Sequence, residues 1–451
     1  MSKWQTKKLS KVTEKIFSGG TPTTTNKAYW NGDINWLSSG ETSNRFIFDT
    51  IQKISLLGVE NSSTKLALQW DTVIASAGQG KTRGQTALLK VDSYINQSII
   101  ALRANRNEIT PLWLFYNLSN RYSELRNISD SHSSRGSLTT ALLKDLEISF
   151  PSINEQDKIT GILFAIDNKI QLNTQTNQTL EQIAQAIFKH WFIDFAPVHA
   201  KANALARGET IEQAELAAMA CLSRKTAEKI TALKTQDPTA YHQLQQTAAA
   251  FPSEFVETEM GQVPKGWEVK PLIEQFDFLG GSQPPKSEHI YEEKEGYIRF
   301  IQNRDYSNEN HKTYIPISKK NKLCSETDIL MDKYGEAGKV RFGISGAYNV
   351  ALAKIEPKNI LFKEFLRWYF MQEKTQAFLF AASLASTRSS LNSQTFIGMN
   401  IFIPTDNVLS AFNVIAEKYI QHSLNLKQEN RTLSEVRDLL LTKLITGEIQ
   451  L

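Results

Sequence analysis

The stretch NEQDKITGILFAIDNKIQLNTQTNQTLEQIAQAIFKHW (154–191) decides the fold of this chain. Apolar residues recur in it at alternating steps of four and three, the heptad spacing of a long helix that packs against another helix. The seam positions are Ile159, Leu163, Ile166, Ile170, Asn173, Asn177, Leu180, Ala184, Ile187 and Trp191. Such a helix spans roughly 50–55 Å at ~1.5 Å per residue. Its apolar stripe requires a partner.

The partner is found in the same chain, 253 residues further on. The equivalent seam positions there are Phe412, Ala416, Tyr419, Ser423, Leu426, Asn430, Leu433, Arg437, Leu440 and Leu444. Ser423 and Arg437 weaken this second seam without removing the repeat. We expect the two helices to pack against each other, and pseudo-two-fold symmetry makes them antiparallel.

Asn177 and Asn430 occupy equivalent seam positions. An asparagine buried in a heptad seam costs stability and fixes the register of the two helices. The alternative is that both side chains are half-exposed and set nothing.

The repeat extends over nearly the whole chain, because residues 1–195 and 267–451 pass through the same series of motifs. The matched stretches include FSGGTPTTT (17–25) with FLGGSQPPK (278–286), INWLSSGE (34–41) with IRFIQNRD (298–305), and DTVIASAGQGKTRG (71–84) with DILMDKYGEAGKVR (328–341). A duplicated unit builds a pseudo-symmetric molecule, which suits a target with two halves. The copies differ most in their loops, which suggests two different specificities.

These patterns predict an α+β protein. Two tandem, pseudo-symmetric mixed α/β domains are joined by a long antiparallel two-helix coiled coil. We place the first domain at 1–150, the first helix at 151–196, a helical connector at 197–262, the second domain at 263–404 and the second helix at 405–451. Within the connector, the alanine-rich stretch 209–235 favours a helix.

Composition narrows the class of protein. The net charge is +4 with a pI near 8.7, which permits nucleic-acid binding without requiring it. No apolar run reaches the ~20 residues of a membrane span, and the first residues lack the apolar stretch of a secretory signal. The two cysteines, Cys221 and Cys324, lie in different regions, so we expect reduced thiols and a cytoplasmic location.

A glycine-rich loop recurs as ASAGQGKTRG (75–84) and KYGEAGKVR (333–341). The first copy resembles a phosphate-binding loop, but Ala75 replaces the required first glycine, which disfavours nucleotide binding. We interpret both copies as mobile loops that present basic side chains outward to DNA. The alternative is an ordinary solvated hairpin turn. The basic residues are Lys81 and Arg83 in the first copy, and Lys333, Lys339 and Arg341 in the second.

Two further pairs of loops carry side chains that suit bases and phosphates. In the first pair, Ser134 and Arg135 correspond to Thr387 and Arg388, and arginine among hydroxyls can pair with guanine or hold a phosphate. The second pair follows a strand in each copy. Its candidate residues are Ser38 and Glu41 in one copy, and Asn303, Arg304 and Tyr306 in the other.

Catalytic and metal-binding signatures do not emerge from the sequence. The seven histidines show no ligand spacing with either cysteine, and no nucleophile–base arrangement or adenine-methyltransferase motif is present. We therefore expect a chain that is not an enzyme on its own and binds no metal or cofactor. Two other interpretations stay open: a stand-alone DNA modification enzyme, and a protein–protein scaffold.

Three phrases point to a known family: FKHWFIDFAPVHAK (188–201), PKGWEVKPL (264–272) and LLLTKLITGEIQL (439–451). Together with the tandem arrangement, they make the whole chain resemble the specificity subunit of type I restriction–modification enzymes. The resemblance implies that the two domains are target recognition domains and that the helices are conserved spacers.

The same resemblance implies the partners. The chain would bind a bipartite, asymmetric site on double-stranded DNA, and the helices would set the gap between the half-sites. It would recruit two methyltransferase (modification) subunits, which motor–nuclease (restriction) subunits join, without contact to a membrane. S-adenosylmethionine, ATP and magnesium would be bound by those partners rather than by this chain.

Overall fold

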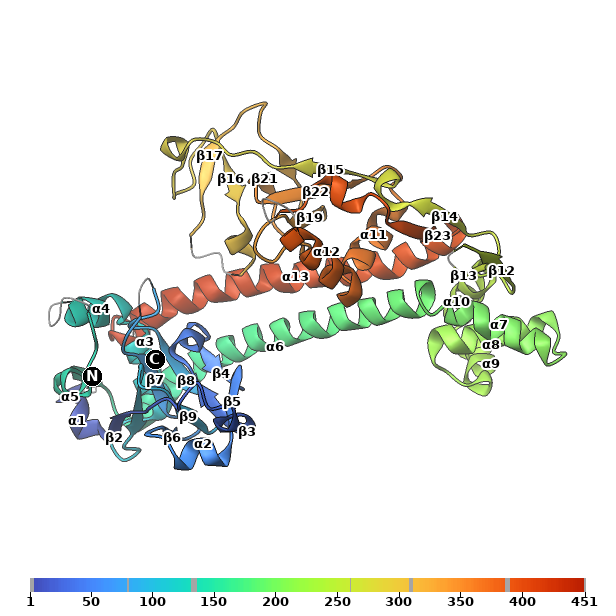
Figure 1. The fold of residues 1–451 in the computed structure, drawn as a ribbon. Coiled ribbons are helices and arrows are strands. Elements are labelled where there is room, and N and C mark those ends of the chain that lie inside the picture. The colour runs from blue at the N-terminus through green and yellow to red at the C-terminus, as the bar shows by residue number, and fades with distance from the viewer. Residues whose placement is uncertain are drawn as a thin grey trace. The chain divides into compact units, whose positions relative to one another are not determined.

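The computed structural model describes residues 4–78, 81–130, 136–259, 261–307, 311–385 and 390–449. The chain divides into two compact units, here called unit 1 (residues 1–172 with 430–451) and unit 2 (residues 173–429). Two long helices, α6 (Ile153–Phe192) and α13 (Asp406–Ile445), each contribute residues to both units (Figure 1). The two heptad stretches therefore form the long helices that the sequence predicts.

Unit 1 consists of short strands, short helices and its share of α6 and α13. Its strands are β1 (Gln5–Lys8), β2 (Thr13–Ser18), β3 (Trp30–Leu37), β4 (Phe46–Ile47), β5 (Gln52–Ile54), β6 (Lys65–Ala67), β7 (Thr72–Ala75), β8 (Thr86–Leu89), β9 (Ser93–Ile95), β10 (Ile99–Ala104) and β11 (Glu147–Phe150). Its short helices are α1 (Leu9–Val12), η1 (Lys27–Tyr29), η2 (Ser39–Ser43), α2 (Leu56–Glu60), α3 (Pro111–Ser119), α4 (Tyr122–Asp130) and α5 (Thr140–Asp145).

The strands of unit 1 form two main sheets. A five-stranded sheet has the order β2-β10-β7-β8-β4, and a four-stranded sheet has the order β5-β3-β9-β6. The pair β1–β11 closes the unit, because it joins the start of the domain to the strand that leads into α6. Apolar side chains of β7 and β10 alternate between two cores, one between the sheets and one against α3 and α6.

Unit 2 has the same kinds of elements and an additional group of helices. Its strands are β12 (Phe255–Thr258), β13 (Gly261–Pro264), β14 (Glu268–Pro271), β15 (Phe276–Gly280), β16 (Tyr297–Ile301), β17 (Tyr314–Pro316), β18 (Leu323–Cys324), β19 (Ile329–Asp332), β20 (Val340–Arg341), β21 (Gly346–Tyr348), β22 (Leu352–Pro357) and β23 (Asn400–Ile403). Its short helices are α7 (Ala196–Ala206), α8 (Ile211–Ser223), α9 (Ala227–Gln236), α10 (Pro238–Ala250), η3 (Leu272–Glu274), η4 (Lys286–Glu288), η5 (Asn303–Tyr306), α11 (Phe362–Phe370), α12 (Glu373–Ala385) and η6 (Ser393–Phe396).

The topology of unit 1 recurs in unit 2. The sheet β15-β22-β19-β20 follows the order β2-β10-β7-β8, and the sheet β17-β16-β21-β18 follows the order β5-β3-β9-β6. Even the single parallel pair of the second sheet is kept, as β3–β9 in one unit and β16–β21 in the other. The predicted pseudo-symmetric α+β fold is therefore confirmed.

Within each unit the segments of α6 and α13 run antiparallel, and Figure 1 draws them in green and red. In unit 1, Arg437 pairs with Asp167 and Asn430 contacts Ile170. Residue numbers therefore increase along α6 as those of their partners on α13 decrease, which is the antiparallel arrangement. In unit 2, Asn173 contacts Glu429 and Phe188 packs against Phe412 in the same sense. The seam predicted from the heptads is thus used in both units.

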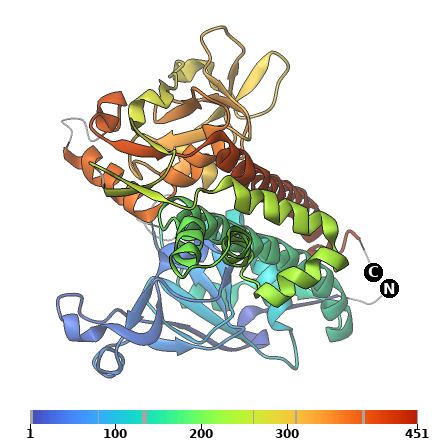
Figure 2. The same ribbon diagram turned by 90° about the vertical axis from the view of Figure 1, so that its right-hand side faces the viewer.

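The connector between the domains, predicted to be helical over 197–262, is a group of helices followed by a hairpin. Four helices, α7 to α10, occupy residues 196–250, and Figure 2 brings them toward the viewer. The alanine-rich stretch is broken at Arg224, whose left-handed backbone (φ 54°) ends α8. The segment up to 262 is not all helical, because β12 and β13 form a hairpin. The connector is anchored to the main core of unit 2 by three buried side chains, those of Val198, Phe251 and Val263.

Candidate nucleic-acid interface

A capped turn follows the same strand in both units. In unit 1, Oε1 of Glu41 accepts hydrogen bonds from the backbone N of Ser38 (3.1 Å) and from its Oγ (3.0 Å). Oε2 of Glu41 accepts from the backbone N of Ile51 at 2.9 Å. In unit 2, Asp305 accepts from the backbone N of Gln302 at 3.0 Å and closes the equivalent turn. Both turns are therefore rigid.

This capping changes which residues of the turn are available to DNA. Glu41 is 5% exposed and Asp305 is 3% exposed, so neither carboxylate lies at the surface. The predicted base contact of Glu41 is not supported, because its oxygens are already used inside the turn. Ser43 and Asn44 are the exposed residues at the end of the turn, and the sequence analysis missed them. The sequence signal that could have shown this is the S-x-x-E spacing of a capping box, because it predicts that the Glu41 side chain caps the turn instead of facing solvent.

In unit 2 the corresponding turn presents different side chains. Arg304 is 55% exposed, and its Nη2 lies 3.3 Å from Oγ1 of Thr313. Asn303 and Tyr306 are half-buried, and burial raises the pKa of the Tyr306 hydroxyl well above its usual value. Arg304 is therefore the most accessible of the three residues predicted in this turn.

The glycine-rich loop of unit 1 does not present Arg83 outward, contrary to the sequence prediction. Arg83 is 6% exposed, its Nη1 donates to the carbonyl O of Gly136 at 2.9 Å, and it forms an ion pair with Asp130. A guanidinium with five donors is well suited to tie two loops together from inside. Lys81, by contrast, is exposed and stays a candidate contact.

The loop of unit 2 repeats this division. Arg341 is mostly buried and donates from Nε (3.1 Å) and Nη2 (2.7 Å) to Oδ2 of Asp332, so it too is held inward. Lys339 is exposed and pairs with Glu336 at 2.7 Å, while Lys333 is half-buried with its Nζ 5.8 Å from the ring centre of Tyr334. The lysines, rather than the arginines, are the accessible cations of both loops.

The structure brings the predicted loops of each unit together. In unit 1, η2 lies against β7 and β8, between which the glycine-rich loop runs, and Arg83 joins that loop to Gly136. In unit 2, the guanidinium of Arg341 lies 5.7 Å from the ring of Tyr306, and Leu391 donates to the carbonyl O of Lys333 at 3.1 Å. Each unit thus has one loop cluster. Ser134, Arg135, Thr387 and Arg388, which the sequence also predicts as DNA contacts, lie outside the described residues.

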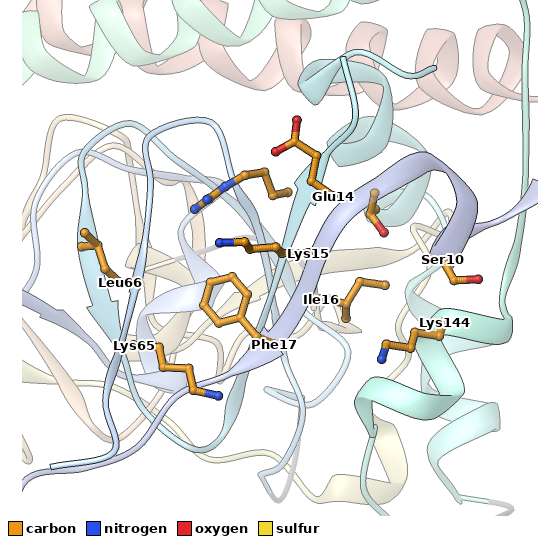
Figure 3. Close-up of a pocket in the computed structure, with 10 residues that line it drawn as sticks. Ser10, Glu14, Lys15, Ile16, Phe17, Lys65, Leu66 and Lys144 are labelled. Atoms are coloured by element: carbon orange, nitrogen blue, oxygen red, sulfur yellow. The ribbon is translucent and has the colours of Figure 1, made fainter. Parts of the chain in front are cut away.

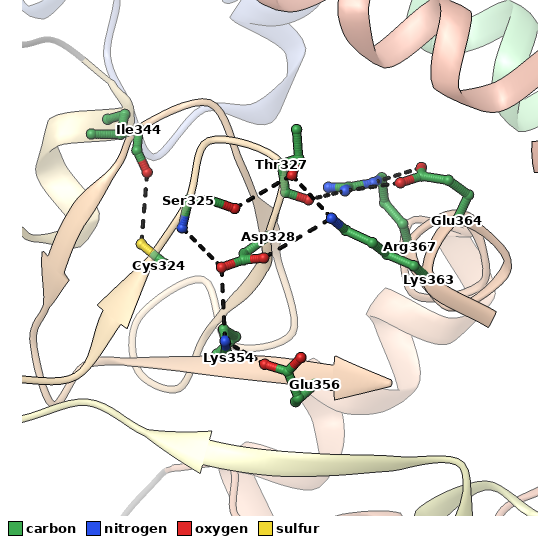
Figure 4. A network of polar contacts seen from close by, with 10 residues as sticks. All are labelled: Cys324, Ser325, Thr327, Asp328, Ile344, Lys354, Glu356, Lys363, Glu364 and Arg367. Carbon is green, nitrogen blue, oxygen red and sulfur yellow. Dashed lines mark hydrogen bonds and ion pairs between the residues drawn. The ribbon is translucent and has the colours of Figure 1, made fainter. Parts of the chain in front are cut away.

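Polar contacts at the start of β19 fix the strand that leads into the unit 2 loop (Figure 4). Asp328 accepts from the backbone N of Ser325 at 2.8 Å and lies 3.8 Å from Nζ of Lys354. Arg367, fully buried in α11, donates to the carbonyl O of Thr327 at 2.6 Å. Asp71 has the matching role in unit 1, where it accepts from Leu68 at 2.9 Å. These contacts position the strand that precedes the loop.

A separate cationic groove of about 470 Å³ lies along β2 and β6 of unit 1. Lys15, Lys65 and Lys144 line it together with the aromatic ring of Phe17, as Figure 3 shows. Because β2 and β6 are at the outer edges of their sheets, the groove is separate from the loop cluster at β7 and β8. We therefore give it no part in base reading.

The asparagines of the helix seam have unequal surroundings. Nδ2 of Asn430 donates to the carbonyl O of Ile170 at 3.3 Å, and both Asn430 and Asn177 are half-buried. The fully buried asparagine is Asn173, which donates to Oε2 of Glu429 at 2.9 Å. A register role for Asn177 and Asn430 stays a prediction, and Asn173 joins them as a candidate.

The described ranges, with their gaps, bear on metal binding and on membrane insertion. There, no group of three or more His, Cys, Asp or Glu side chains is placed to hold a metal ion. None of the helices in the same ranges combines the length and apolar character that a bilayer crossing requires.

Fold and loops together define a tandem-repeat α+β protein whose two copies carry equivalent loop clusters. Comparison with known proteins identifies the family. The model of the type I restriction modification DNA specificity domain matches residues 1–182 and 264–418. The chain is 31% identical over 443 residues to the specificity subunit of the type I restriction enzyme HindI from Haemophilus influenzae, covering 92% of this chain and 94% of that protein.

A second relative supports the same family, and a solved structure has a similar fold. The chain is 24% identical to the specificity subunit of the type I restriction enzyme MjaIX from Methanocaldococcus jannaschii, over 99% of this chain and 94% of that one. Its fold is similar to the crystal structure of a type I restriction–modification S subunit from M. genitalium, with a TM-score of 0.51, 15% identity, and 98% and 96% of the two chains covered. The chain therefore belongs to the specificity subunits of type I restriction–modification systems, the non-catalytic members of those complexes.

Proposed function

We propose that the loop cluster of each unit reads one half of a bipartite, asymmetric site on double-stranded DNA. The observation that carries the proposal is the repeat itself. Equivalent loops converge on equivalent scaffolds in both units, whereas the exposed residues of the turns differ, Ser43 and Asn44 in one and Arg304 and Ser307 in the other. A shared frame with different side chains is what two half-sites of different sequence require.

The side chains of the clusters suit the two kinds of DNA contact. Asparagine pairs with adenine and arginine with guanine, which favours Asn44 and Arg304 as base contacts. Lys81 and Lys339 are flexible cations and fit phosphate oxygens. Arg135 and Arg388, with Ser134 and Thr387, stay candidate contacts on the evidence of their sequence alone.

The helix pair would set the gap between the half-sites and recruit two methyltransferase subunits. Large apolar side chains are exposed on both helices, which is unusual for surfaces that stay in water. They include Leu172 (57%) on α6 and Val414 (58%) and Leu439 (62%) on α13. Motor–nuclease subunits would join through the methyltransferases, and S-adenosylmethionine, ATP and magnesium would be bound by these partners.

The test is to co-express the chain with the methyltransferase encoded beside it and to map methylated adenines across a genome. A single bipartite motif with a fixed gap, lost when the chain is deleted, is the expected result. Methylation that persists without the chain would contradict the proposal. Duplex binding by the complex that does not weaken with salt would instead favour a protein scaffold.

A matched variant tests the role of the helices. Insertion of seven residues between 172 and 178 adds two helical turns and keeps the heptad phase. We expect the gap of the methylated motif to change while both half-sites stay the same. Altered half-sites with an unaltered gap would show that the helices do not set the spacing.

A further inference from the structure

Asp167 of α6 is the centre of a buried polar node in unit 1. It is 3% exposed, yet three residues donate to its carboxylate. Nε of Arg45 lies 3.0 Å and the hydroxyl of Tyr116 2.8 Å from Oδ2, while Nη1 of Arg437 lies 2.9 Å from Oδ1. A buried carboxylate is stable only with such partners, so each of them is held in place in return.

Arg45 connects this node to the recognition turn. It follows Asn44 directly, at the end of the capped turn that begins at Ser38. Its guanidinium also lies over the rings of Phe115 (5.1 Å) and Tyr116 (5.3 Å), and its carbonyl O accepts from Leu88 of β8 at 3.0 Å. The backbone and the side chain of Arg45 are therefore both fixed, which leaves the exposed end of the turn little freedom relative to α6.

The node is a specific feature of unit 1 rather than a consequence of the repeat. The positions 253 residues from Asp167 and Arg437 are held by Ile420 and Ala184 in unit 2, and both are buried apolar residues. Arg437 is also the charged residue that weakened the second heptad seam in the sequence. A buried ion pair contributes little net stability compared with apolar residues of similar size, so its presence calls for another explanation.

We propose that Asp167 is a positioning residue for base reading, which aligns the Ser38–Arg45 turn of unit 1 with the helix pair through Arg45. This inference rests on the proposed function, because it assigns the turn to one half-site. Removing the carboxylate leaves the Arg45 guanidinium in contact only with the two aromatic rings, so the turn is held to unit 1 mainly through the backbone hydrogen bond between Arg45 and Leu88 and can tilt about it. The half-site read by unit 1 would then be discriminated less well, while the half-site read by unit 2 would be unaffected.

The experiment uses the complex of the full chain with its methyltransferase and compares Asp167→Asn with the unaltered chain. Methylation rates are measured on duplexes that carry single-base changes in one half-site or the other. We expect about a tenfold loss of discrimination in the half-site of unit 1, the size of one base contact, and less than about a twofold change in the other. If Asp167→Asn discriminates in both half-sites as well as the unaltered chain does, the proposal is overturned.

Two controls separate positioning from loss of stability. Gln156→Leu removes another buried polar side chain of α6 in unit 1, which accepts from the backbone N of Thr110 at 2.8 Å and donates to the carbonyl O of Pro151 at 3.0 Å. It should destabilise the unit without a change in discrimination. The double variant Asp167→Ile with Arg437→Ala introduces the residues of unit 2 and removes the guanidinium of α13 that would otherwise lose its buried partner. Compared with Asp167→Asn, this double variant should regain thermal stability but not discrimination in the half-site of unit 1. If it regains both, the role of the node is purely structural.

The proposed function and this inference fail in different ways. If the unaltered complex discriminates neither half-site, the assignment of the loop clusters is wrong. If it discriminates both and Asp167→Asn does so equally well, only the positioning role is wrong.

Discussion

The two segments of the helix pair have the same heptad repeat but different chemistry. In unit 1 the seam carries an ionic node around Asp167, whereas in unit 2 the rings of Phe188, Trp191 and Phe192 surround Phe412 with centroids 5.0–5.9 Å apart. The two units therefore share the heptad positions and the helical backbone, but the side-chain interactions at those positions differ. Directional bonds define geometry in one unit, and contact area stabilises the other.

The first prediction tests the aromatic side of this comparison. Phe412→Ala removes a ring that is 1% exposed and contacts three other aromatic side chains. The loss should be about 3–5 kcal/mol in the free energy of unfolding of unit 2. Hydrogen exchange followed by mass spectrometry on peptides of α11 would measure it. A loss below about 1 kcal/mol would mean that the cluster can collapse around the cavity.

A second prediction compares the two inward arginines of the loops. Arg341 pairs with Asp332, which is 1% exposed on its side chain, whereas the partner of Arg83, Asp130, is 57% exposed. Arg341→Ala leaves a buried carboxylate and should cost about 3 kcal/mol. Arg83→Ala leaves a carboxylate that water can reach, so its cost should be smaller, about 1–2 kcal/mol. Chemical denaturation of both variants would show the order, and the reverse order would refute the burial argument.

Much of this fold was accessible from sequence because repeats and heptads are periodic signals. The long helices and the duplicated domains follow from spacings, and the antiparallel pairing follows from the pseudo-two-fold symmetry of the repeat. The candidate interface was harder. Glu41 and Arg83 have the residue types of a DNA contact, but whether they face water or their own loop depends on distant partners such as Ile51 and Gly136. Sequence spacing located the loops correctly and could not orient their side chains.

The third prediction concerns recognition, and it uses one exposed residue from each unit. Arg304→Ala should cost about 1–3 kcal/mol in binding of the complex to its site and relax only the half-site read by unit 2. Asn44→Ala should do the same for unit 1. If either residue contacts phosphate instead, affinity falls for all sequences and the slope of binding against salt decreases by about one. Unchanged binding with unchanged salt dependence would remove both residues from the interface.

The smallest expected effect is a difference in the response of the two units to pH. Burial raises the pKa of the Asp332 carboxyl, although Arg341 opposes the shift. A carboxyl whose pKa is higher in the folded state than its usual value of about 3.9 binds more protons when folded. Its contribution to stability is therefore complete below that value and is lost as the pH rises through the folded pKa. Ala75 occupies the equivalent position of unit 1 and does not titrate.

Unit-specific hydrogen exchange between pH 3.5 and 7 would measure this difference. Asp332→Asn should flatten the decrease in the stability of unit 2 with rising pH and leave unit 1 unaltered. Glu336 contributes with the opposite sign, because its hydrogen bond to Lys339 lowers its pKa and its stabilisation is lost as the pH falls. Glu336 is present in the unaltered protein and in the Asp332→Asn variant. The difference between their slopes of stability against pH therefore reports on Asp332. Identical slopes would show that Arg341 compensates fully for burial of the carboxylate, and the two loops would then be electrostatically equivalent.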